Sequence, residues 1–257
     1  MQHLFTPDGE AALAAVLRLR PLVALDFDGT LAPIVARPED ARISQAVGQR
    51  LRQLALRLPV AIVTGRTVAD VRERLGFEPQ FVIGNHGAED SGNPAGTARR
   101  IAALAPLRAA LQAHADELAA AGVMLEDKGL SIALHYRLSR ERARAQVLIE
   151  TLLAPLRPAL RIFGGKMVVN AMAPDAPDKG AAMLSLVARC GAAAALFAGD
   201  DVNDESVFIA APAHWLTLRI GRDDPGSRAR FGIDSQQEVA LLLERMLAQL
   251  PADAARA

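Results

Sequence analysis

Apolar runs of strand length alternate with amphipathic stretches in the first third of the chain. Uninterrupted apolar segments cover Leu22–Leu25, Val60–Val63 and residues 81–83, and an amphipathic stretch spans about residues 43–58. Runs without polar interruption are typical of strands buried on both faces of a parallel sheet, and the stretches between them supply the crossover helices. The pattern predicts an α/β fold built from parallel βαβ units.

The same alternation returns in the last third. The pattern predicts a helix over Lys179–Cys190 that ends at Gly191, followed by strands at residues 195–198 and 215–218. A last helix is predicted to begin at Ser235, because the spacing from Ser235 to Glu238 fits a capping box.

The middle of the chain has a different pattern. A turn-rich break at residues 91–96 precedes an Ala-rich helical stretch that runs to about Ala121. Residues 131–137 alternate with period two, which predicts a half-buried antiparallel strand with Ile132, Leu134 and Tyr136 on its apolar face. A second helix from about Arg140 and a strand-like segment at 166–170 follow. We therefore predict an α+β domain at 94–173, inserted into an α/β core formed by 1–93 and 174–257.

Composition narrows the class of protein. The 257 residues are 51% hydrophobic, and Lys plus Arg equal Asp plus Glu at 29 each, so nothing in the charge indicates a nucleic acid or a membrane as partner. The single Cys190 excludes an internal disulfide and a zinc-thiolate cluster. The chain has no basic leader and no apolar run near the ~20 residues of a membrane span. We expect a cytoplasmic protein that acts on a small molecule.

Acidic residues follow two of the predicted strands. Asp26 and Asp28 come directly after Leu22–Leu25, and the cluster Asp200, Asp201 and Asp204 follows the strand at 195–198. Residues two apart on an extended segment face the same way, and two close carboxylates need a proton, a cation or a basic side chain. Mg²⁺ prefers oxygen ligands of this kind. We expect Mg²⁺ to be held by Asp26, the backbone carbonyl of Asp28, and Asp200, with Asp201 and Asp204 in support; a solvated turn is the alternative.

Two further positions suit a phosphate group. Thr64, Gly65 and Arg66 end the strand Val60–Val63 and offer a hydroxyl and backbone amides near a helix start. Lys179 begins a helix, where a cation is disfavoured unless an anion lies nearby. A solvated surface lysine is the alternative for Lys179.

Four segments in this order resemble the four motifs of the haloacid-dehalogenase (HAD) phosphohydrolase superfamily. They are the string DFDGTL at 26–31, Thr64, Lys179, and the string GDDVND at 199–204. The resemblance implies an α/β fold with a HAD-type, Rossmann-like parallel-sheet core and an inserted C2-type α+β cap. It also implies that Asp26 is the nucleophile, Asp28 the general acid and base, and Thr64 and Lys179 the residues that stabilise the phosphoryl group.

Other segments are similar to the trehalose-6-phosphate phosphatase family. They are GNHGAE at 84–89, Glu126-x-Lys128, Ser131-x-x-x-His135-Tyr136-Arg137 and GKMVV at 165–169. The resemblance implies hydrolysis of trehalose 6-phosphate, a synthase of that ester as pathway neighbour, and a set of substrate contacts beyond Thr64, Gly65 and Arg66. These contacts are Asn85, His86, Glu126, Lys128, His135, Arg137, Lys166 and Asn170.

Two positions depart from that family. Asn170 stands where the family usually has Glu, and Asn203 stands where it usually has Thr. An amide can still accept a hydrogen bond from a sugar hydroxyl through its oxygen. The departure leaves a glucosylglycerol-phosphate or sucrose-phosphate phosphatase as the nearest alternative. A phosphomutase and a non-catalytic sugar-phosphate sensor are the rivals from other classes.

Overall fold

The computed structural model describes residues 1–35, 37–90, 96–221 and 224–251. The chain forms two compact units, one of Met1–Ser91 with Pro177–Ala257 and one of Gly92–Ala176. The predicted break at 91–96, and with it the predicted boundary between 93 and 94, falls outside the described residues except for Gly96. The predicted end of the insert at residue 173 lies close to the end of the second unit at Ala176. None of the helices in the described ranges has the length and apolar character to span a bilayer.

The first unit contains an eight-stranded sheet in the order β1-β12-β11-β10-β2-β3-β4-β5. Every neighbouring pair is parallel except β4 with β5, which is antiparallel. The strands are β1 (Gln2–His3), β2 (Leu22–Leu25), β3 (Val60–Val63), β4 (Phe81–Gly84), β5 (Glu89–Asp90), β10 (Ala195–Gly199), β11 (Leu216–Ile220) and β12 (Phe231–Ile233). The predicted strands all form, with β11 beginning one residue later than predicted. The three short strands β1, β5 and β12 were not predicted, because two or three residues carry no periodicity.

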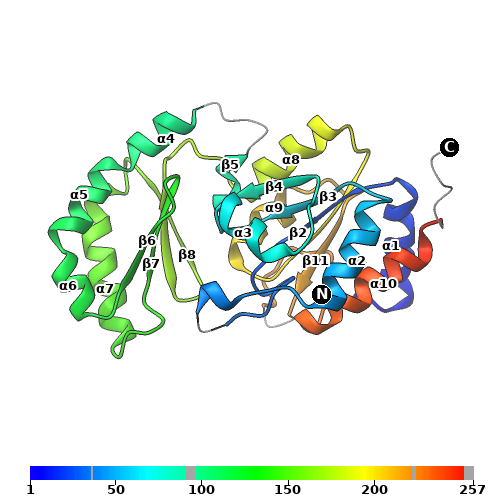
Figure 1. Cartoon of the computed structure of the whole chain (residues 1–257), viewed down its shortest axis with the longest axis horizontal. Coiled ribbons are helices and arrows are strands. Elements are labelled where there is room, and N and C mark those ends of the chain that lie inside the picture. Colours follow the sequence, from blue (N-terminus) through cyan, green and yellow to red (C-terminus); the bar gives the residue numbers. More distant parts are fainter. Residues whose placement is uncertain (36, 91–95, 222–223, 252–257) are drawn as a thin grey trace. The chain divides into compact units, whose positions relative to one another are not determined.

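Helices cover both faces of this sheet (Figure 1). They are α1 (Pro7–Arg18), α2 (Gln45–Ala55), α3 (Val68–Leu75), α8 (Lys179–Cys190), α9 (Glu205–Ala210) and α10 (Val239–Gln249). Helix α10 packs against α1 and α2, and α8 packs against α9. The crossovers from β2 to β3 and from β10 to β11 step in opposite directions along the sheet, so right-handed connections place α2 and α9 on opposite faces. The central strands are therefore buried on both sides, as their apolar runs predict.

The predicted limits of α8 are confirmed, and the predicted start of the last helix is wrong. Asp178 caps α8 by accepting from the N–H of Ala181, and Gly191 ends it in the left-handed region at φ 67°. At the last helix, a 3₁₀ turn over Gln236–Glu238 precedes α10, and the Ser235 side chain makes no capping bond. The tighter turn lets the Glu238 carboxylate reach back to the N–H of Asp234 at 2.6 Å instead.

The second unit is a four-stranded antiparallel sheet, in the order β6-β7-β9-β8, with helices packed on one face. Its elements are α4 (Thr97–Ala103), α5 (Ala105–Ala113), α6 (Ala115–Ala120), β6 (Met124–Asp127), β7 (Ser131–His135), α7 (Arg142–Leu153), β8 (Arg161–Gly165) and β9 (Val168–Met172). A mostly parallel core sheet and a separate antiparallel sheet with helices confirm the predicted fold class.

Three details of this unit differ from the prediction. The Ala-rich stretch is three short helices rather than one, because Pro106 has no N–H to continue the first and the His114 ring contacts the Ala110 carbonyl at 2.9 Å where the second ends. The strand β7 is not half-buried: Ser131 and Ala133 are as inaccessible as Ile132 and Leu134. The strand expected at 166–170 begins only at Val168.

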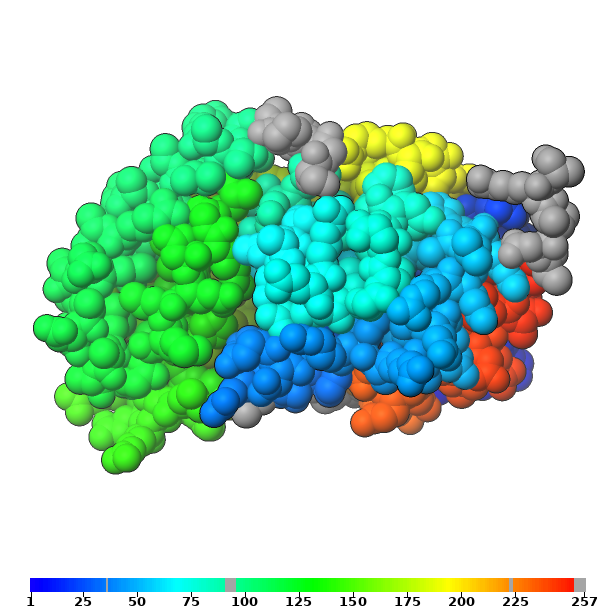
Figure 2. All heavy atoms as spheres, viewed as in Figure 1, coloured from blue at the N-terminus to red at the C-terminus, as the bar shows by residue number. Residues whose placement is uncertain are grey.

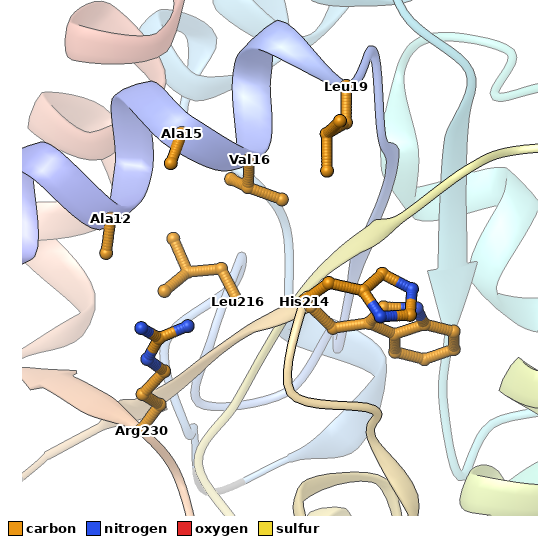
Figure 3. A pocket seen from close by; sticks show the side chains of 8 residues that line it. Ala12, Ala15, Val16, Leu19, His214, Leu216 and Arg230 are labelled. Carbon is orange, nitrogen blue, oxygen red and sulfur yellow. The ribbon is translucent and has the colours of Figure 1, made fainter.

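A pocket of 160 Å³ lies where α1 packs over the amino end of β11. Figure 3 shows Ala12, Ala15 and Val16 along α1 and Leu19 directly after it, facing Leu216, with His214 and Arg230 beside them. Ligands of α/β sheets bind at the carboxyl ends of the strands, so this pocket lies at the opposite edge of the sheet from the acidic residues described next.

Candidate active site

Three acidic side chains meet at the carboxyl ends of β2 and β10. These strands are neighbours, and the N–H of Asp26 donates to the carbonyl of Ala198 at 2.9 Å. Carboxylate oxygens of Asp26, Asp200 and Asp204 lie within 4.8 Å of one another, and all three residues are buried. The parallel register of two adjacent strands therefore brings acids 174 to 178 positions apart in the sequence into one cluster.

Lys179 supplies positive charge to this cluster. Its ammonium lies 3.1 Å from Asp26 Oδ1 and 2.7 Å from Asp204 Oδ1, and its side chain is 3% exposed. Burial opposes the charged form, but Asp204 and then Asp26 outweigh it and raise the pKa of Lys179. Burial raises the pKa of Asp26, which Lys179 opposes and Asp204, Asp200 and Asp28 reinforce. Lys179 is therefore a fixed cation beside a carboxylate that is costly to ionise.

The cluster fits an additional hard cation. The cluster holds three buried carboxylates, and the one ammonium beside it contacts two of them, so the side chains alone carry excess negative charge. Oxygen donors of this kind suit Mg²⁺. Gly29 keeps the turn close to the cluster: it has φ 79°, and a Cβ there would lie 2.1 Å from Asp200 Oδ2. The donor set is thus compatible with the predicted metal, with Asp204 as a buried member rather than a peripheral one.

The Asp28 side chain is bound by an arginine. Arg66 donates from Nε to Asp28 Oδ2 at 2.7 Å and from Nη2 to Asp28 Oδ1 at 2.8 Å. Arg66 also donates to Asp70 Oδ2 at 2.7 Å and to the Pro38 carbonyl at 2.8 Å. Burial alone would lower the pKa of Arg66, but Asp28 and then Asp70 raise it above its usual range. The guanidinium, predicted as a substrate contact, is occupied by protein acceptors.

The loop after β3 presents the Thr64 hydroxyl. Thr64 is buried, and its Oγ1 accepts from the backbone N–H of Arg66 at 3.2 Å, so the hydroxyl proton is directed elsewhere. The carbonyls of Thr64 and Arg66 accept from the N–H groups of His86 and Asn85 at 2.9 and 2.7 Å. Asn85 and His86 both have positive φ, at 49° and 54°. Strained backbone that persists because its surroundings fix it is common at functional sites. The turn at 85–86 therefore holds the loop in place.

The acidic loop after β10 is organised by its own side chains. The N–H of Asp201 donates to Asp204 Oδ2 at 2.9 Å, and Asn203 Nδ2 donates to Asp201 Oδ2 at 2.9 Å. Arg219, buried at the end of β11, donates to the Asp201 carbonyl at 3.3 Å and lies 3.5 Å from Glu205. Asp201 thus shapes the loop, while Asp204 takes part in the cluster.

Sequence reasoning missed three residues around the site. Asp70 binds Arg66, Arg219 supports the acidic loop, and Glu89 accepts from Asn85 Nδ2 at 2.7 Å and from the N–H of Val68 at 3.0 Å. Arg219 left a signal, because a charged residue interrupts the apolar run Leu216–Ile220. Glu89 is the last residue of the GNHGAE segment, although that segment did not indicate its role as an acceptor. Asp70 left no signal, since it lies on a polar helix turn.

In the second unit, Glu126 gathers two basic side chains. Glu126 Oε2 lies 2.9 Å from His135 Nε2 and 3.4 Å from Lys128 Nζ. Burial would raise the pKa of Glu126, but the hydrogen bond from His135 and the charge of Lys128 outweigh it and lower that pKa. In the β-sheet register Glu126, Ala133, Asn170 and Phe163 form one row. Glu126, His135 and Asn170 therefore share the sheet face opposite the one packed by Ile132 and Leu134.

Arg137 and Lys166 lie near the end of that sheet. Arg137 Nη2 donates to the Lys166 carbonyl at 3.4 Å, and Lys166 belongs to the turn between β8 and β9, where Met167 has φ 62°. The Arg137 side chain is thus bound to the backbone of Lys166, although neither residue lies in a strand.

Comparison with known proteins identifies the family. A family model described as trehalose-phosphatase matches residues 24–214. A trehalose-phosphate phosphatase of Mycobacterium tuberculosis is 33% identical over 261 aligned residues, which cover 95% of this chain and 66% of that protein. The chain thus spans slightly less than two-thirds of the length of that relative.

Solved structures have the same fold. The C-terminal domain of the C. albicans trehalose-6-phosphate phosphatase superposes with a TM-score of 0.77 at 18% identity, covering 93% of this chain and 96% of that one. A trehalose-6-phosphate phosphatase related protein superposes with a TM-score of 0.72 at 25% identity, covering 88% and 97%. With the family model covering most of the chain, this protein belongs to the trehalose-phosphatase family of HAD-like phosphohydrolases.

Proposed function

We propose that the chain hydrolyses trehalose 6-phosphate to trehalose and inorganic phosphate through an aspartyl-phosphate intermediate. The observation that carries the proposal is the buried contact of Lys179 with Asp26 and Asp204, at the sheet edge where Asp28 and Thr64 also lie. Family membership supports the substrate. A synthase as pathway neighbour and a cytoplasmic location stay predictions from the sequence.

In the first half-reaction, a carboxylate oxygen of Asp26 attacks phosphorus in line. The bond from phosphorus to the sugar oxygen breaks as the bond to Asp26 forms, and protonated Asp28 gives its proton to the departing oxygen. The Thr64 hydroxyl, whose oxygen already accepts from Arg66 N–H, donates to a phosphoryl oxygen. Lys179 neutralises the charge that accumulates on the phosphoryl group.

In the second half-reaction, Asp28 acts as the base. It takes a proton from the water that attacks the phosphorus of the aspartyl-phosphate, and the bond from phosphorus to Asp26 breaks. Inorganic phosphate is released, Asp26 is again a carboxylate, and Asp28 again carries the proton. One side chain thus serves both steps, which requires that it alternate between its two protonation states.

We propose Mg²⁺ as the cofactor. Asp26, Asp200 and the backbone carbonyl of Asp28 would hold it, with Asp201 and Asp204 in support. When bound, it would reduce the repulsion between the anionic nucleophile and the anionic phosphate.

The substrate-binding face is proposed to be the polar face of the second unit. Glu126, Lys128, His135 and Asn170 are the candidates for hydroxyl recognition, and Arg137 and Lys166 flank them. On the first unit Gly65, Arg66, Asn85 and His86 stay predicted contacts. Asn170 is the position that separates trehalose 6-phosphate from glucosylglycerol phosphate and sucrose phosphate as the preferred ester.

The test is phosphate release across a panel of esters. Trehalose 6-phosphate, sucrose 6-phosphate, glucosylglycerol phosphate and glucose 6-phosphate are compared with Mg²⁺ and with EDTA. Strong preference for trehalose 6-phosphate, abolished by EDTA, is the expected result. Metal-dependent release that favours another ester would keep the chemistry and replace the substrate. A rearranged sugar phosphate without release of inorganic phosphate would indicate a phosphomutase. Binding of the ester without turnover would indicate a sensor.

A further inference from the structure

A row of four alternating charges begins at Asp28 and runs along helix α3. Arg66 binds Asp28 through two hydrogen bonds of 2.7 and 2.8 Å, and its Nη1 donates to Asp70 at 2.7 Å. Arg74 binds Asp70 through two more, of 2.5 and 3.0 Å. We name Asp28, Arg66, Asp70 and Arg74 the charge relay.

Arg66 has little freedom to move within the relay. It is 8% exposed, and four of its five N–H groups donate to Asp28, Asp70 and the Pro38 carbonyl. Its guanidinium lies 5.2 Å from the centre of the Phe27 ring. A guanidinium bound to a carboxylate through two parallel hydrogen bonds fixes the plane of that carboxylate as well as its distance. The orientation of the Asp28 side chain is therefore set by Arg66.

Asp70 and Arg74 hold Arg66 from outside the site. Asp70 lies four residues after Arg66 and four before Arg74, so the helical repeat places the two arginines on either side of it. Arg74 also donates to the Glu39 carbonyl at 2.5 Å, and Arg66 to that of Pro38. The relay thus ties α3 to the 3₁₀ turn Pro38–Asp40, and Figure 2 shows that blue segment beside the cyan surface of α3.

We propose that Asp70 and Arg74 are positioning residues for proton transfer by Asp28, acting through Arg66. Neither residue contacts the cluster of Asp26, Asp200 and Asp204 through any hydrogen bond or ion pair known among the described residues. The proposal rests on the proposed function, because it assigns Asp28 the role of acid toward the leaving sugar oxygen. Loosening Asp70 then misplaces the proton donor without removing it.

Substrates with different leaving groups distinguish a positioning role of Asp70 and Arg74 from a merely structural one. A sugar oxygen needs a proton as it departs, whereas p-nitrophenolate and acetate depart as stable anions. The kcat/KM of p-nitrophenyl phosphate and of acetyl phosphate reports attack by Asp26 with no help from an acid. The ratio of kcat/KM for trehalose 6-phosphate to kcat/KM for these two activated substrates therefore measures proton donation by Asp28.

The experiment compares Asp70→Asn, Arg74→Gln and the wild type with all three substrates. We expect Asp70→Asn to lower the ratio by about tenfold, within the range of general acid catalysis, and Arg74→Gln to lower it less. Arg50→Gln is the matched control, since it breaks the ion pair of Arg50 with Glu244 at 2.8 Å, outside the relay, and should leave the ratio unchanged.

The outcomes separate the relay from the proposed function. An unchanged or increased ratio in Asp70→Asn, or an equal loss with all three substrates, overturns the relay while the wild type still hydrolyses trehalose 6-phosphate. A wild type that hydrolyses only the two activated substrates overturns the proposed function first. If Asp70→Asn fails to fold, Arg74→Gln decides, and a constant ratio in that variant overturns the relay.

Discussion

The ammonium of Lys179 lies 2.7 Å from the carboxylate of Asp204, and neither side chain is more than 3% exposed. Each charge of such a buried pair depends on the other, because removing one partner leaves an uncompensated buried charge. The same ammonium lies 3.1 Å from Asp26, and Asp200 belongs to the same cluster. The cluster thus contains more carboxylates than cations, and this excess of negative charge determines how substitutions in it should change stability.

Asp26→Asn should abolish phosphate release without loss of stability. Because burial raises the pKa of Asp26, the stability linked to its protonated form is present at low pH and is lost as the pH rises through the folded-state pKa. Above that pKa the ionised carboxylate costs stability, and asparagine removes that cost. We expect a Tm in EDTA that is at least as high as that of the wild type.

Lys179→Met is the contrasting variant. It leaves the buried carboxylates without their cation and should cost about 3–5 kcal/mol. Residual turnover in Asp26→Asn would contradict the assignment of Asp26 as the nucleophile, and a lower Tm than that of the wild type would contradict the cost of its buried charge.

Mg²⁺ should raise the Tm of the wild type, and Asp200→Asn should remove most of that increase. A ligand that binds only the folded state at a hundred times its Kd adds about 2.7 kcal/mol. The matched control is Asp234→Asn, because His3, Asp234 and Glu238 form a second group of possible metal ligands at the β1–β12 edge. Thermal melts with Mg²⁺ and with EDTA decide between them. If only Asp234→Asn loses the rise in Tm with Mg²⁺, the metal site lies at that edge instead.

Gly65→Ala should destabilise the protein, and a second substitution at His86 should restore it. A Cβ on Gly65 would lie 2.3 Å from Cε1 of the His86 ring. Overpacking of this kind typically costs about 1–3 kcal/mol. Urea unfolding of Gly65→Ala, His86→Ala and the double variant forms a cycle. Additive losses in the double variant would show that the ring does not restrict this position.

The central strands could be predicted from the sequence because a strand buried on both faces leaves an uninterrupted apolar run. β2 and β3 match their predicted limits, and the acids that follow β2 and β10 meet because parallel strands end at one edge. The limits of α8 follow from Asp178 and Gly191, whose residue types suit the start and the end of a helix. These features depend on local sequence, which is why they could be predicted.

Features set by contacts that leave no pattern in the sequence could not be predicted. Nothing near Asp28 indicates that Arg66 would bind both of its oxygens, and nothing near Glu238 indicates that its carboxylate would bind the N–H of Asp234 instead of closing a box with Ser235. The burial of Ser131 and Ala133 also escaped, because a period-two pattern gives the direction of side chains and not what covers them.

Asp70→Asn should lower stability near neutral pH and lose this effect in acid. Burial would raise the pKa of Asp70, but hydrogen bonds from Arg74 and Arg66 outweigh it and lower that pKa to about 2. Stability from this carboxylate is therefore present above the unfolded pKa, near 3.8, and is lost as the pH falls toward 2. Because Asp70 is about a third exposed, we expect a difference of about 1 kcal/mol. Denaturant unfolding over this pH range checks it, and a difference that persists at the acid end would contradict the sign.

Glu126→Gln should raise the KM for trehalose 6-phosphate by about tenfold and leave turnover of acetyl phosphate unchanged, a loss of about 1.4 kcal/mol in binding. The reason is that Glu126 lies on the polar sheet face of the second unit with His135 and Lys128, and is not one of the carboxylates assigned to the reaction. Its neighbour Asp127 provides the matched control, because consecutive strand residues face opposite sides and Asp127 binds Arg108 at 2.6 Å instead. Asp127→Asn should therefore keep the KM of the wild type. Equal effects of the two substitutions on KM would show that the polar face does not select the sugar. Asn170 would then no longer be the position expected to set the preferred ester.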